Sequence, residues 1–179
     1  TTADYVAQVV TAMGQERIGS VLKHFPGYGN NQDTHTGVAV DERPYETFET
    51  SDFLPFQAGI QAGADAVLVS HNIVNSMDES LPASLSPAVH QILRDTLGFD
   101  GVILTDDLAM DAVAQYAQDG SAAVLAVQAG NDMVLTTDFE TQIPQVIAAV
   151  EDGTIPMEQI DQSVARVLSW KYDLGLLGY

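Results

Sequence analysis

The hydrophobic positions of the chain fall into short continuous runs, separated by longer segments in which apolar residues recur every three or four positions. Continuous apolar runs are typical of strands buried on both faces, and they predict strands at 18–25, 64–72, 100–107 and 131–137. The periodic segments predict helices at 2–15, 51–63, 86–98, 119–130, 139–151 and 157–173. Strands that alternate with helices indicate a parallel sheet, so the expected fold class is α/β.

Capping residues mark the bounds of two of these helices. Ser51 is expected to begin the second helix. Ser86 is expected to be the N-cap of the third, with Pro87 in its first turn and Gly98 directly after its last turn. These residues predict where the chain enters and leaves the two helices.

The order of elements is one helix, four strand–helix units and a final helix, which fits either an open doubly wound sheet or half of a (β/α)8 TIM barrel. A whole barrel usually needs about 250 residues, whereas the chain has 179. No glycine-rich phosphate-binding motif follows a strand, which weakens the case for a nucleotide-binding sheet. Two connections, 26–49 and 72–85, are long, and such loops in a compact domain are commonly functional.

Composition excludes several classes of partner and site. The chain is 46% hydrophobic, as expected of a globular domain, and its formal net charge of -19 would repel nucleic acid phosphates and anionic membrane surfaces. We therefore expect neither as a partner. The absence of cysteine excludes disulfides and zinc–thiolate sites. No apolar run reaches the roughly 18 residues of a membrane-spanning helix.

Polar side chains stand where each predicted strand ends, at the edge where α/β folds place their functional sites. They are Lys23 and His24, Ser70 and His71, Asp106 and Asp107, and Thr136 and Thr137. Of the acidic pair, Asp106 is expected to be catalytic or metal-binding, and Asp107 to cap the helix that follows. His71 alone is ambiguous, because a histidine at a strand end serves packing as well as function.

The stretch KHFPGYGNNQDTHTG, residues 23–37, holds three of the ten Lys, Arg and His residues of the chain, beside a carboxylate. Asp33 and His35 are two positions apart, so in an extended segment their side chains can lie on the same side. Asp33 would then bond one ring nitrogen of His35 and fix its tautomer, which suits proton transfer. The alternative is a local Asp turn beside an exposed histidine.

Three motifs in this order resemble those of glycoside hydrolase family 3, in its β-N-acetylhexosaminidase branch. That branch carries K-H-F-P-G-H-G, then D-[ST]-H, then [ST]-D-D-L-x-M. The chain has KHFPGYG at 23–29, DTH at 33–35 and TDDLAM at 105–110, with SH at 70–71 between them. One departure is Tyr28, which stands where the motif has its second histidine.

The resemblance implies a TIM-barrel fold and retaining hydrolysis of terminal β-linked N-acetylglucosamine. It implies a carbohydrate substrate and neither a cofactor nor a metal ion. By position, Asp106 matches the nucleophile of the family, His35 matches the acid/base, and Asp33 matches the partner of that histidine.

The resemblance also assigns substrate-binding residues and an extent. Lys23 and His24 match residues that hydrogen-bond the sugar hydroxyls, and His71 matches a strand-end histidine that lines the same pocket. The motifs match the second half of the family's barrel, and the first four strands, which carry an Asp and an Arg that bind the sugar, have no counterpart in 1–179. We therefore expect 1–179 to be a single partial catalytic domain without its N-terminal half. We expect it to be inactive in isolation and to associate with itself through its open edges.

Three other interpretations stay open. A histidine acid/base repels an incoming anion less than a carboxylate would, so phosphate could replace water as the acceptor, as in a phosphorylase. Lys23, His24, His71 and Asp106 could instead line the metal centre of a metal-dependent hydrolase on the same kind of barrel. The chain could also be a fragment that binds carbohydrate without cleaving it.

Overall fold

The computed structural model of the chain describes residues 1–29, 39–110, 113, 115–116 and 121–178. Asp33 and His35, and with them the predicted acid/base pair, lie outside the described residues. Within the described part, no helix is both long enough and apolar enough to cross a bilayer.

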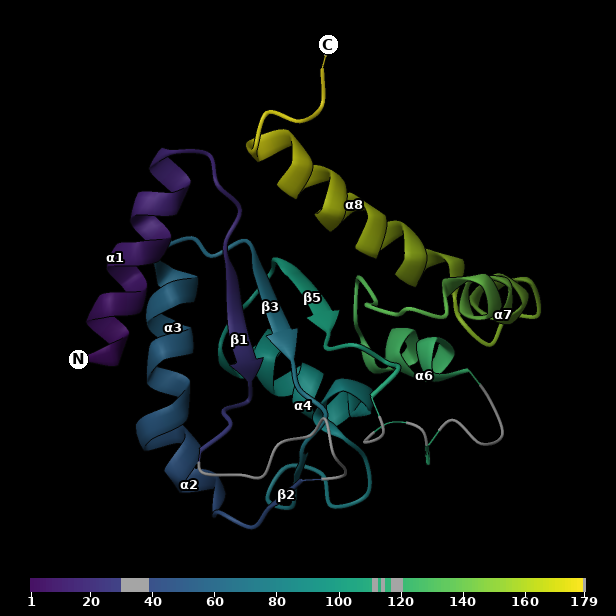
Figure 1. Ribbon diagram of the computed structural model, residues 1–179, viewed down its shortest axis with the longest axis horizontal. Coiled ribbons are helices and arrows are strands. Elements are labelled where there is room, and N and C mark those ends of the chain that lie inside the picture. Colours follow the sequence, from purple (N-terminus) through teal and green to yellow (C-terminus); the bar gives the residue numbers. More distant parts are fainter. Residues whose placement is uncertain (30–38, 111–112, 114, 117–120, 179) are drawn as a thin grey trace.

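A parallel sheet of three strands forms the centre of the fold (Figure 1). The strands are β1 (Val21–Phe25), β3 (Ala66–Val69) and β5 (Val102–Thr105), in the order β1-β3-β5. Two-residue strands, β2 (Val40–Asp41) and β4 (Ile73–Val74), form a second parallel pair beyond the carboxyl ends of the sheet. Parallel strands alternating with helices confirm the expected α/β class.

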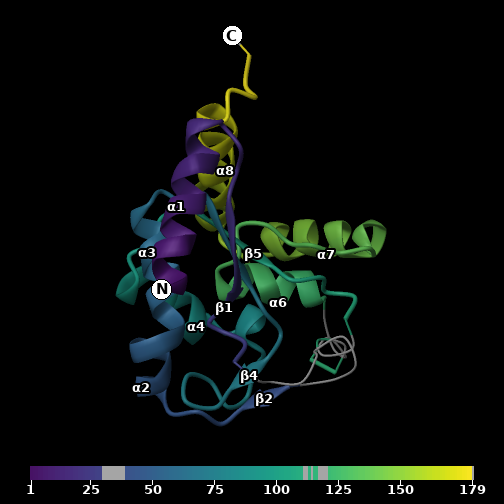
Figure 2. The same ribbon diagram turned by 60° about the vertical axis from the view of Figure 1, so that its left-hand side comes forward.

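One face of the sheet packs against helices and forms the main core. These helices are α1 (Thr2–Gln15), α3 (Phe53–Gln61) and α4 (Pro87–Gln91), with α1 and α3 side by side in both views (Figures 1 and 2). Because side chains alternate along a strand, Val67 and Ile103 point into this layer. There they belong to the same buried cluster as Phe25 and Phe53, whose rings stack with centroids 5.7 Å apart.

The opposite face of the sheet is covered by the last helix. The alternate strand residues that form it are Ala66, Leu68, Val102 and Leu104. Val167 and Trp170 of α8 (Met157–Asp173) pack against them. In Figure 1, α8 runs from beside α7 (Phe139–Glu151) toward the loop that precedes β1.

Helix α7 stacks on α6 (Ala122–Ala129) and projects away from the sheet (Figure 2). Its outer side carries Phe139, Ile143 and Ile147, each more than half exposed. These residues are four positions apart and therefore share one face of the helix. An exposed apolar face of this kind is consistent with self-association, which stays a prediction.

The fourth predicted strand, at 131–137, is reduced to a single parallel bridge between Met133 and Leu104. Side-chain oxygens replace the backbone acceptors on both sides of that bridge: the carboxylate of Asp132 accepts the N–H of Ile103 at 2.9 Å, and Thr105 Oγ1 accepts the N–H of Leu135 at 3.1 Å. The segment therefore occupies the place of a fourth strand beside β5 without a regular ladder.

Helix bounds are partly as predicted. Ser86 is the N-cap before Pro87, and its hydroxyl accepts the N–H of Val89. The prediction that Ser51 begins a helix is wrong, because α2 (Tyr45–Thr47) and a π-helical turn (Phe48–Asp52) continue directly into α3. Two buried residues of this segment, Phe48 and Phe53, are five positions apart, which fits the wider π turn and falls outside the 3.6-residue period.

Candidate active site

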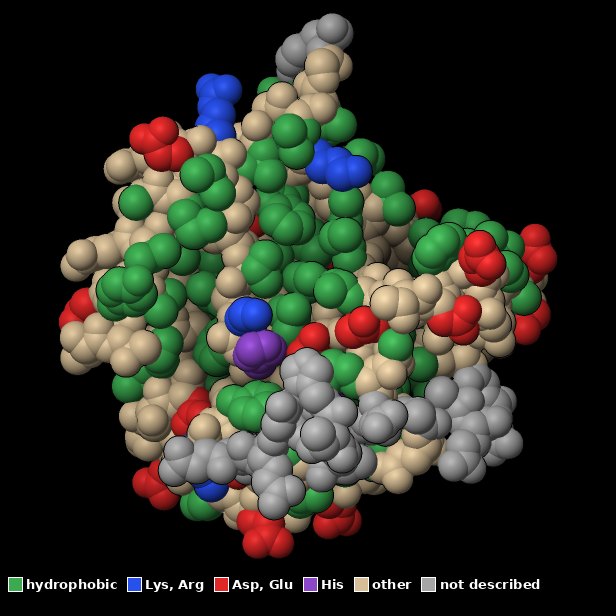
Figure 3. All heavy atoms as spheres, in the orientation of Figure 1, with side chains coloured by type: hydrophobic (Ala, Val, Ile, Leu, Met, Phe, Trp, Pro, Cys, Tyr) green, Lys and Arg blue, Asp and Glu red, His purple; other side chains and the backbone are tan. Residues whose placement is uncertain are grey.

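The carboxyl ends of β1, β3 and β5 bring together residues that are far apart in the sequence. Lys23 and His24 belong to β1, His71 follows β3, and Asp106 follows β5. On this side of the molecule, Figure 3 shows a cationic side chain, a histidine and acidic side chains next to one another, bordered by hydrophobic side chains. Parallel strands place their carboxyl ends at one edge, so the topology explains this meeting of polar groups.

The carboxylate of Asp106 is held by the backbone on one side only. The N–H of Asp106 donates to the carbonyl of Val69 at 3.0 Å, which fixes the residue to β3. Its Oδ1 accepts the N–H of Asp107 at 2.9 Å. Its Oδ2 lies 4.0 Å from Nε2 of His24, and the side chain is 23% exposed. One carboxylate oxygen is thus oriented by the backbone, and the other lies on the side of His24.

Lys23 and His24 present nitrogen atoms at the same edge. Lys23 is exposed, and among the described residues its ammonium has no hydrogen bond or ion pair. The side chain of His24 is 34% exposed, and its ring contacts that of Tyr28 with centroids 5.8 Å apart. The side chain of Lys23 is therefore accessible to a ligand, and that of His24 lies between Tyr28 and Asp106.

Asp107 accepts a backbone N–H as expected, but not as the cap of a helix. Its Oδ1 accepts the N–H of Ala109 at 2.9 Å. The backbone of Met110 donates to the carbonyl of Asp107 at 3.1 Å, so the capped segment is a turn and not a regular helix. With its carboxylate used in this way, Asp107 stabilises the loop that carries Asp106.

His71 is fully buried, and both of its ring nitrogens are hydrogen-bonded within the protein. Nε2 lies 2.9 Å from the carbonyl oxygen of Asp107, which can only accept, so Nε2 carries a hydrogen. Nδ1 lies 2.7 Å from Oγ of Ser84 and accepts from that hydroxyl in the neutral ring. These contacts support a role in holding the loop after β5, and sugar binding by His71 stays a prediction.

Two further residues of this region, Ser84 and Arg43, were not predicted from the sequence. Ser84 has no motif around it, and its side chain has a role through its contact with His71. Arg43 lies between the carboxylates of Asp41 and Asp52. The one signal for Arg43 in the sequence is rarity, because the chain has only six Lys and Arg residues.

The metal-centre alternative finds no ligand set in the described part of the chain. There, no group of three or more His, Asp or Glu side chains is arranged to hold a metal ion. The strand-end histidine His71 instead has its ring nitrogens on Ser84 and on the backbone of Asp107.

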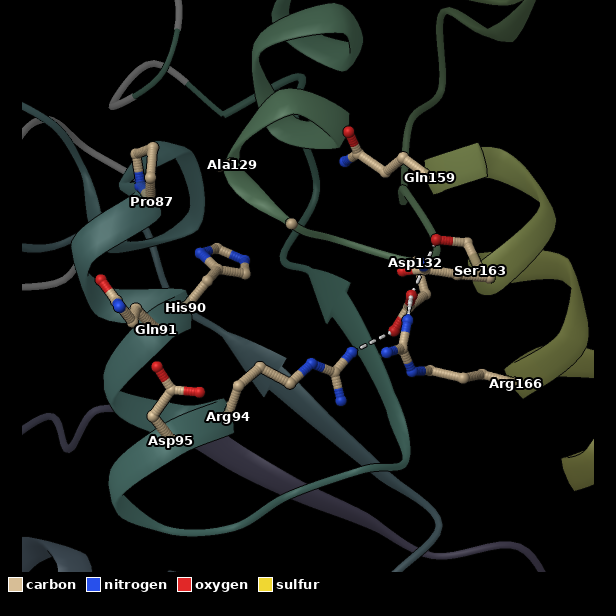
Figure 4. A pocket seen from close by; sticks show the side chains of 12 residues that line it. Pro87, His90, Gln91, Arg94, Asp95, Ala129, Asp132, Gln159, Ser163 and Arg166 are labelled. Atoms are coloured by element: carbon tan, nitrogen blue, oxygen red, sulfur yellow. Dashed lines mark hydrogen bonds and ion pairs between the residues drawn. The ribbon is translucent and has the colours of Figure 1, made fainter. Parts of the chain in front are cut away.

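A cavity of about 290 Å³ lies toward the amino-terminal end of β5, between α4, the end of α6 and α8 (Figure 4). At its base Asp132, 1% exposed, accepts from Arg94 at 2.6 Å, from Arg166 at 3.0 Å and from Ser163 at 2.8 Å. Burial lowers the pKa of Arg94, and the adjacent Asp132 opposes that shift. These bonds join α8 to the segment after α4, and we interpret the cluster as structural.

Comparison with known proteins agrees with the family that the motifs indicate. A family model described as Glycosyl hydrolase family 3 N terminal domain matches residues 1–170. A curated beta-hexosaminidase of Stenotrophomonas maltophilia (strain K279a) is 42% identical over 172 residues, which are 94% of this chain and 50% of that protein. A curated beta-hexosaminidase of Xylella fastidiosa (strain 9a5c) is 40% identical over 135 residues, 74% of this chain and 40% of that protein. The chain spans half or less of the length of these relatives.

Solved structures show the same similarity. A glycoside hydrolase family 3 beta-N-acetylglucosaminidase from Paenibacillus sp. str. FPU-7 aligns with a TM-score of 0.89 and 34% identity, over 97% of this chain and 34% of that one. The beta-N-acetylglucosaminidase from Thermotoga maritima aligns with a TM-score of 0.76 and 28% identity, over 90% of this chain and 36% of that one. The expected partial-barrel architecture is thereby confirmed.

Proposed function

The chain belongs to glycosyl hydrolase family 3, and on that premise we propose that it carries the reacting groups of a retaining hydrolase that removes terminal β-linked N-acetylglucosamine. The observation that carries the proposal is the carboxylate of Asp106, which is oriented by the N–H of Asp107 and open on the side of His24. The printed names of the relatives, which are hexosaminidases and N-acetylglucosaminidases, support the choice of sugar.

In the first step Asp106 acts as the nucleophile. Its Oδ2 attacks the anomeric carbon, the bond from that carbon to the leaving oxygen breaks, and a glycosyl ester of Asp106 forms. A second attack by water on the same carbon releases the sugar and restores the carboxylate, so the configuration is retained. His24 lies 4.0 Å from the carboxylate and Lys23 precedes it on β1, and both would bind hydroxyls of the sugar ring.

His35 is proposed to be the acid/base, supported by Asp33. It would give its proton to the leaving oxygen in the first step and take one from the attacking water in the second. Both residues lie outside the described part of the chain, so this assignment rests on the DTH motif at 33–35. A histidine next to a carboxylate can serve in both directions at neutral pH.

We further propose that the chain supplies one half of a catalytic barrel. Among the described residues, the outer edge of β1 pairs with no strand, and the segment 131–135 pairs only with β5. The length of the curated relatives, at least twice the matched region, is consistent with a second half of similar size. On this proposal, 1–179 alone holds the reacting groups without the whole sugar pocket.

The test is covalent trapping on the product of the complete reading frame that contains this chain. A 5-fluoro β-N-acetylglucosaminyl fluoride has a good leaving group, while its ring fluorine slows the second step, so a glycosyl ester accumulates. Peptide mapping by mass spectrometry should find the adduct on Asp106. The neighbouring Asp107→Asn variant should still be labelled, and Asp106→Asn should not. A folded protein that binds the sugar but gives no adduct, or one elsewhere, would overturn the nucleophile assignment.

A further inference from the structure

A compact ion cluster lies beside the residues that directly follow β1. All three nitrogens of the Arg43 guanidinium donate hydrogen bonds: Nε and Nη2 reach the carboxylate of Asp41 at 3.0 and 2.7 Å, and Nη1 reaches that of Asp52 at 3.0 Å. The guanidinium also lies over the ring of Phe48, 4.4 Å from its centroid. Two carboxylates and one aromatic ring thus contact the guanidinium, which restricts the orientation of the Arg43 side chain.

The cluster requires its arginine. The side chain of Asp41 is 1% exposed and that of Asp52 is 10% exposed, so both carboxylates have lost most of their water. A buried carboxylate without a charged partner is strongly unfavourable, and Arg43 partners both. The hydrogen bonds that Arg43 donates to Asp41 raise the pKa of Arg43, which keeps the guanidinium charged.

The backbone that leaves β1 lies directly on this cluster. A Cβ atom on Gly27 would overlap the carboxylate of Asp52, and one on Gly29 would come within 2.8 Å of Cζ of Arg43. Both glycines have positive φ, 128° and 53°, a region that other residues rarely adopt. The two glycines therefore permit a close approach that no side chain would allow.

The backbone that returns from the loop is bound to the same arginine. Asp41 belongs to β2, whose partner β4 begins two residues after His71. The carbonyl of Asp41 accepts the N–H of Asn75 at 3.0 Å, and its carboxylate accepts the backbone N–H of Arg43 at 3.0 Å. This side of the loop is thereby fastened to the segment that follows β3.

From these contacts we infer that Arg43 is a positioning residue for the proposed acid/base. It joins the two described stems, 26–29 and 39–41, between which Asp33 and His35 lie in the sequence. Fixing both ends of a short segment reduces the conformations available to it and sets where it begins and ends relative to Asp106. The inference rests on the proposed role of His35, but it concerns residues that do not touch the sugar.

The kinetic test compares Arg43→Lys with His35→Ala in the complete reading-frame product. Lysine keeps the charge but cannot bridge two carboxylates with a planar fork. An unactivated disaccharide needs a proton on its leaving oxygen. With this substrate, kcat of Arg43→Lys should fall by about tenfold to a hundredfold, as expected for a misplaced catalytic group. With a 2,4-dinitrophenyl glycoside, which needs no acid, kcat/KM, which reports the step that forms the ester, should stay within about threefold of the wild-type value.

A matched control and a double variant separate positioning from general damage. Arg94→Lys breaks an ion pair with a carboxylate that is also 1% exposed, that of Asp132, but at the other end of the sheet. It should not distinguish the two substrates. If Arg43 acts through His35, the double variant His35→Ala/Arg43→Lys should lose no more activity on the disaccharide than His35→Ala alone. Independent, multiplying losses would overturn the inference.

A measurement without turnover makes the inference independent of activity. Hydrogen exchange in peptides that cover 26–29 and 39–43 should be faster at both stems in Arg43→Lys and unchanged there in Arg94→Lys. If Arg43→Lys does not fold, Asp52→Asn removes one arm of the cluster and should loosen 26–29 in the same way. Unchanged exchange at the stems would refute the role of Arg43. If the activity loss in His35→Ala does not depend on the leaving group, the acid/base proposal is refuted instead.

Discussion

Nε2 of His24 lies 4.0 Å from Oδ2 of Asp106, on the side of the carboxylate that the backbone does not hold. A direct N–H···O hydrogen bond is about 2.9 Å long, so His24 is near this oxygen without hydrogen-bonding it. Oδ1 is already bound to the N–H of Asp107. Among the described residues Oδ2 accepts no hydrogen bond, and it lies on the side of His24, where a nucleophile beside a sugar-binding group would stand.

The replacement Asp106→Ala should abolish hydrolysis of activated and unactivated substrates alike. We expect kcat to fall by at least about 10⁴-fold, because no ester can form without the carboxylate. The side chain is partly exposed and stands at a strand end, so circular dichroism and urea unfolding should show an intact fold. Substantial residual turnover by a folded variant would argue for a different nucleophile.

The replacement His35→Ala should discriminate between leaving groups. Loss of the acid should slow unactivated glycosides by about 10²- to 10⁴-fold and leave the first step with dinitrophenyl glycosides nearly unchanged. The measurement is kcat/KM, which reports the first step, for a series of aryl glycosides of different leaving-group pKa. Equal losses across the series would mean that His35 does not protonate the leaving oxygen.

The replacement His71→Ala distinguishes sugar binding from support of the loop. Because the ring is fully buried and bonded to Ser84 and to the carbonyl of Asp107, we expect a loss of about 2–4 kcal/mol in the free energy of unfolding. Ser84→Ala, which removes one of these bonds, should cost about 1 kcal/mol. A supporting role lowers kcat through Asp106, whereas a rise in KM at unchanged kcat would identify His71 as a sugar ligand.

The replacement Asp132→Asn should lower the free energy of unfolding without changing the catalysed reaction. Asp132 is 1% exposed and accepts from two arginines, so loss of its charge leaves both without their partner. We expect unfolding to become easier by about 3 kcal/mol in urea titrations. Asp95→Asn, an exposed change in the same region, should stay within about 0.5 kcal/mol. A neutral result at Asp132 would show that the cluster is dispensable.

Acid should weaken the fold through His90. Burial lowers the pKa of His90 below its usual 6.5, and its Nδ1 donates to the carbonyl of Ser86 at 2.8 Å. Below about pH 6.5 the unfolded chain takes up a proton at this site that the folded chain does not, so stability falls as the pH falls. Relative to His90→Gln, the wild type should lose up to about 1.4 kcal/mol per pH unit in that window. Parallel stability–pH curves for the two proteins would contradict this.

Local patterns in the sequence were sufficient for much of the fold. Continuous apolar runs located β1, β3 and β5, because a strand buried on both faces needs apolar residues at every position. The N-cap at Ser86 was predictable because a hydroxyl before a helix accepts a backbone N–H that is close to it in sequence. The strand at 131–137 was misjudged, because the side chain of Asp132 takes a bond that a strand would give to the backbone.

The sequence by itself determined the chemistry that is available: a strand that ends in Lys23 and His24, a DTH motif, and Asp106 after another strand. These follow from residue type and spacing along the chain. Only the tertiary structure decided which groups meet. It placed His24 4.0 Å from Asp106, buried His71 behind the loop of Asp107, and set Arg43 between Asp41 and Asp52. Such contacts depend on strand order and on the packing of segments far apart in sequence, which no local pattern encodes.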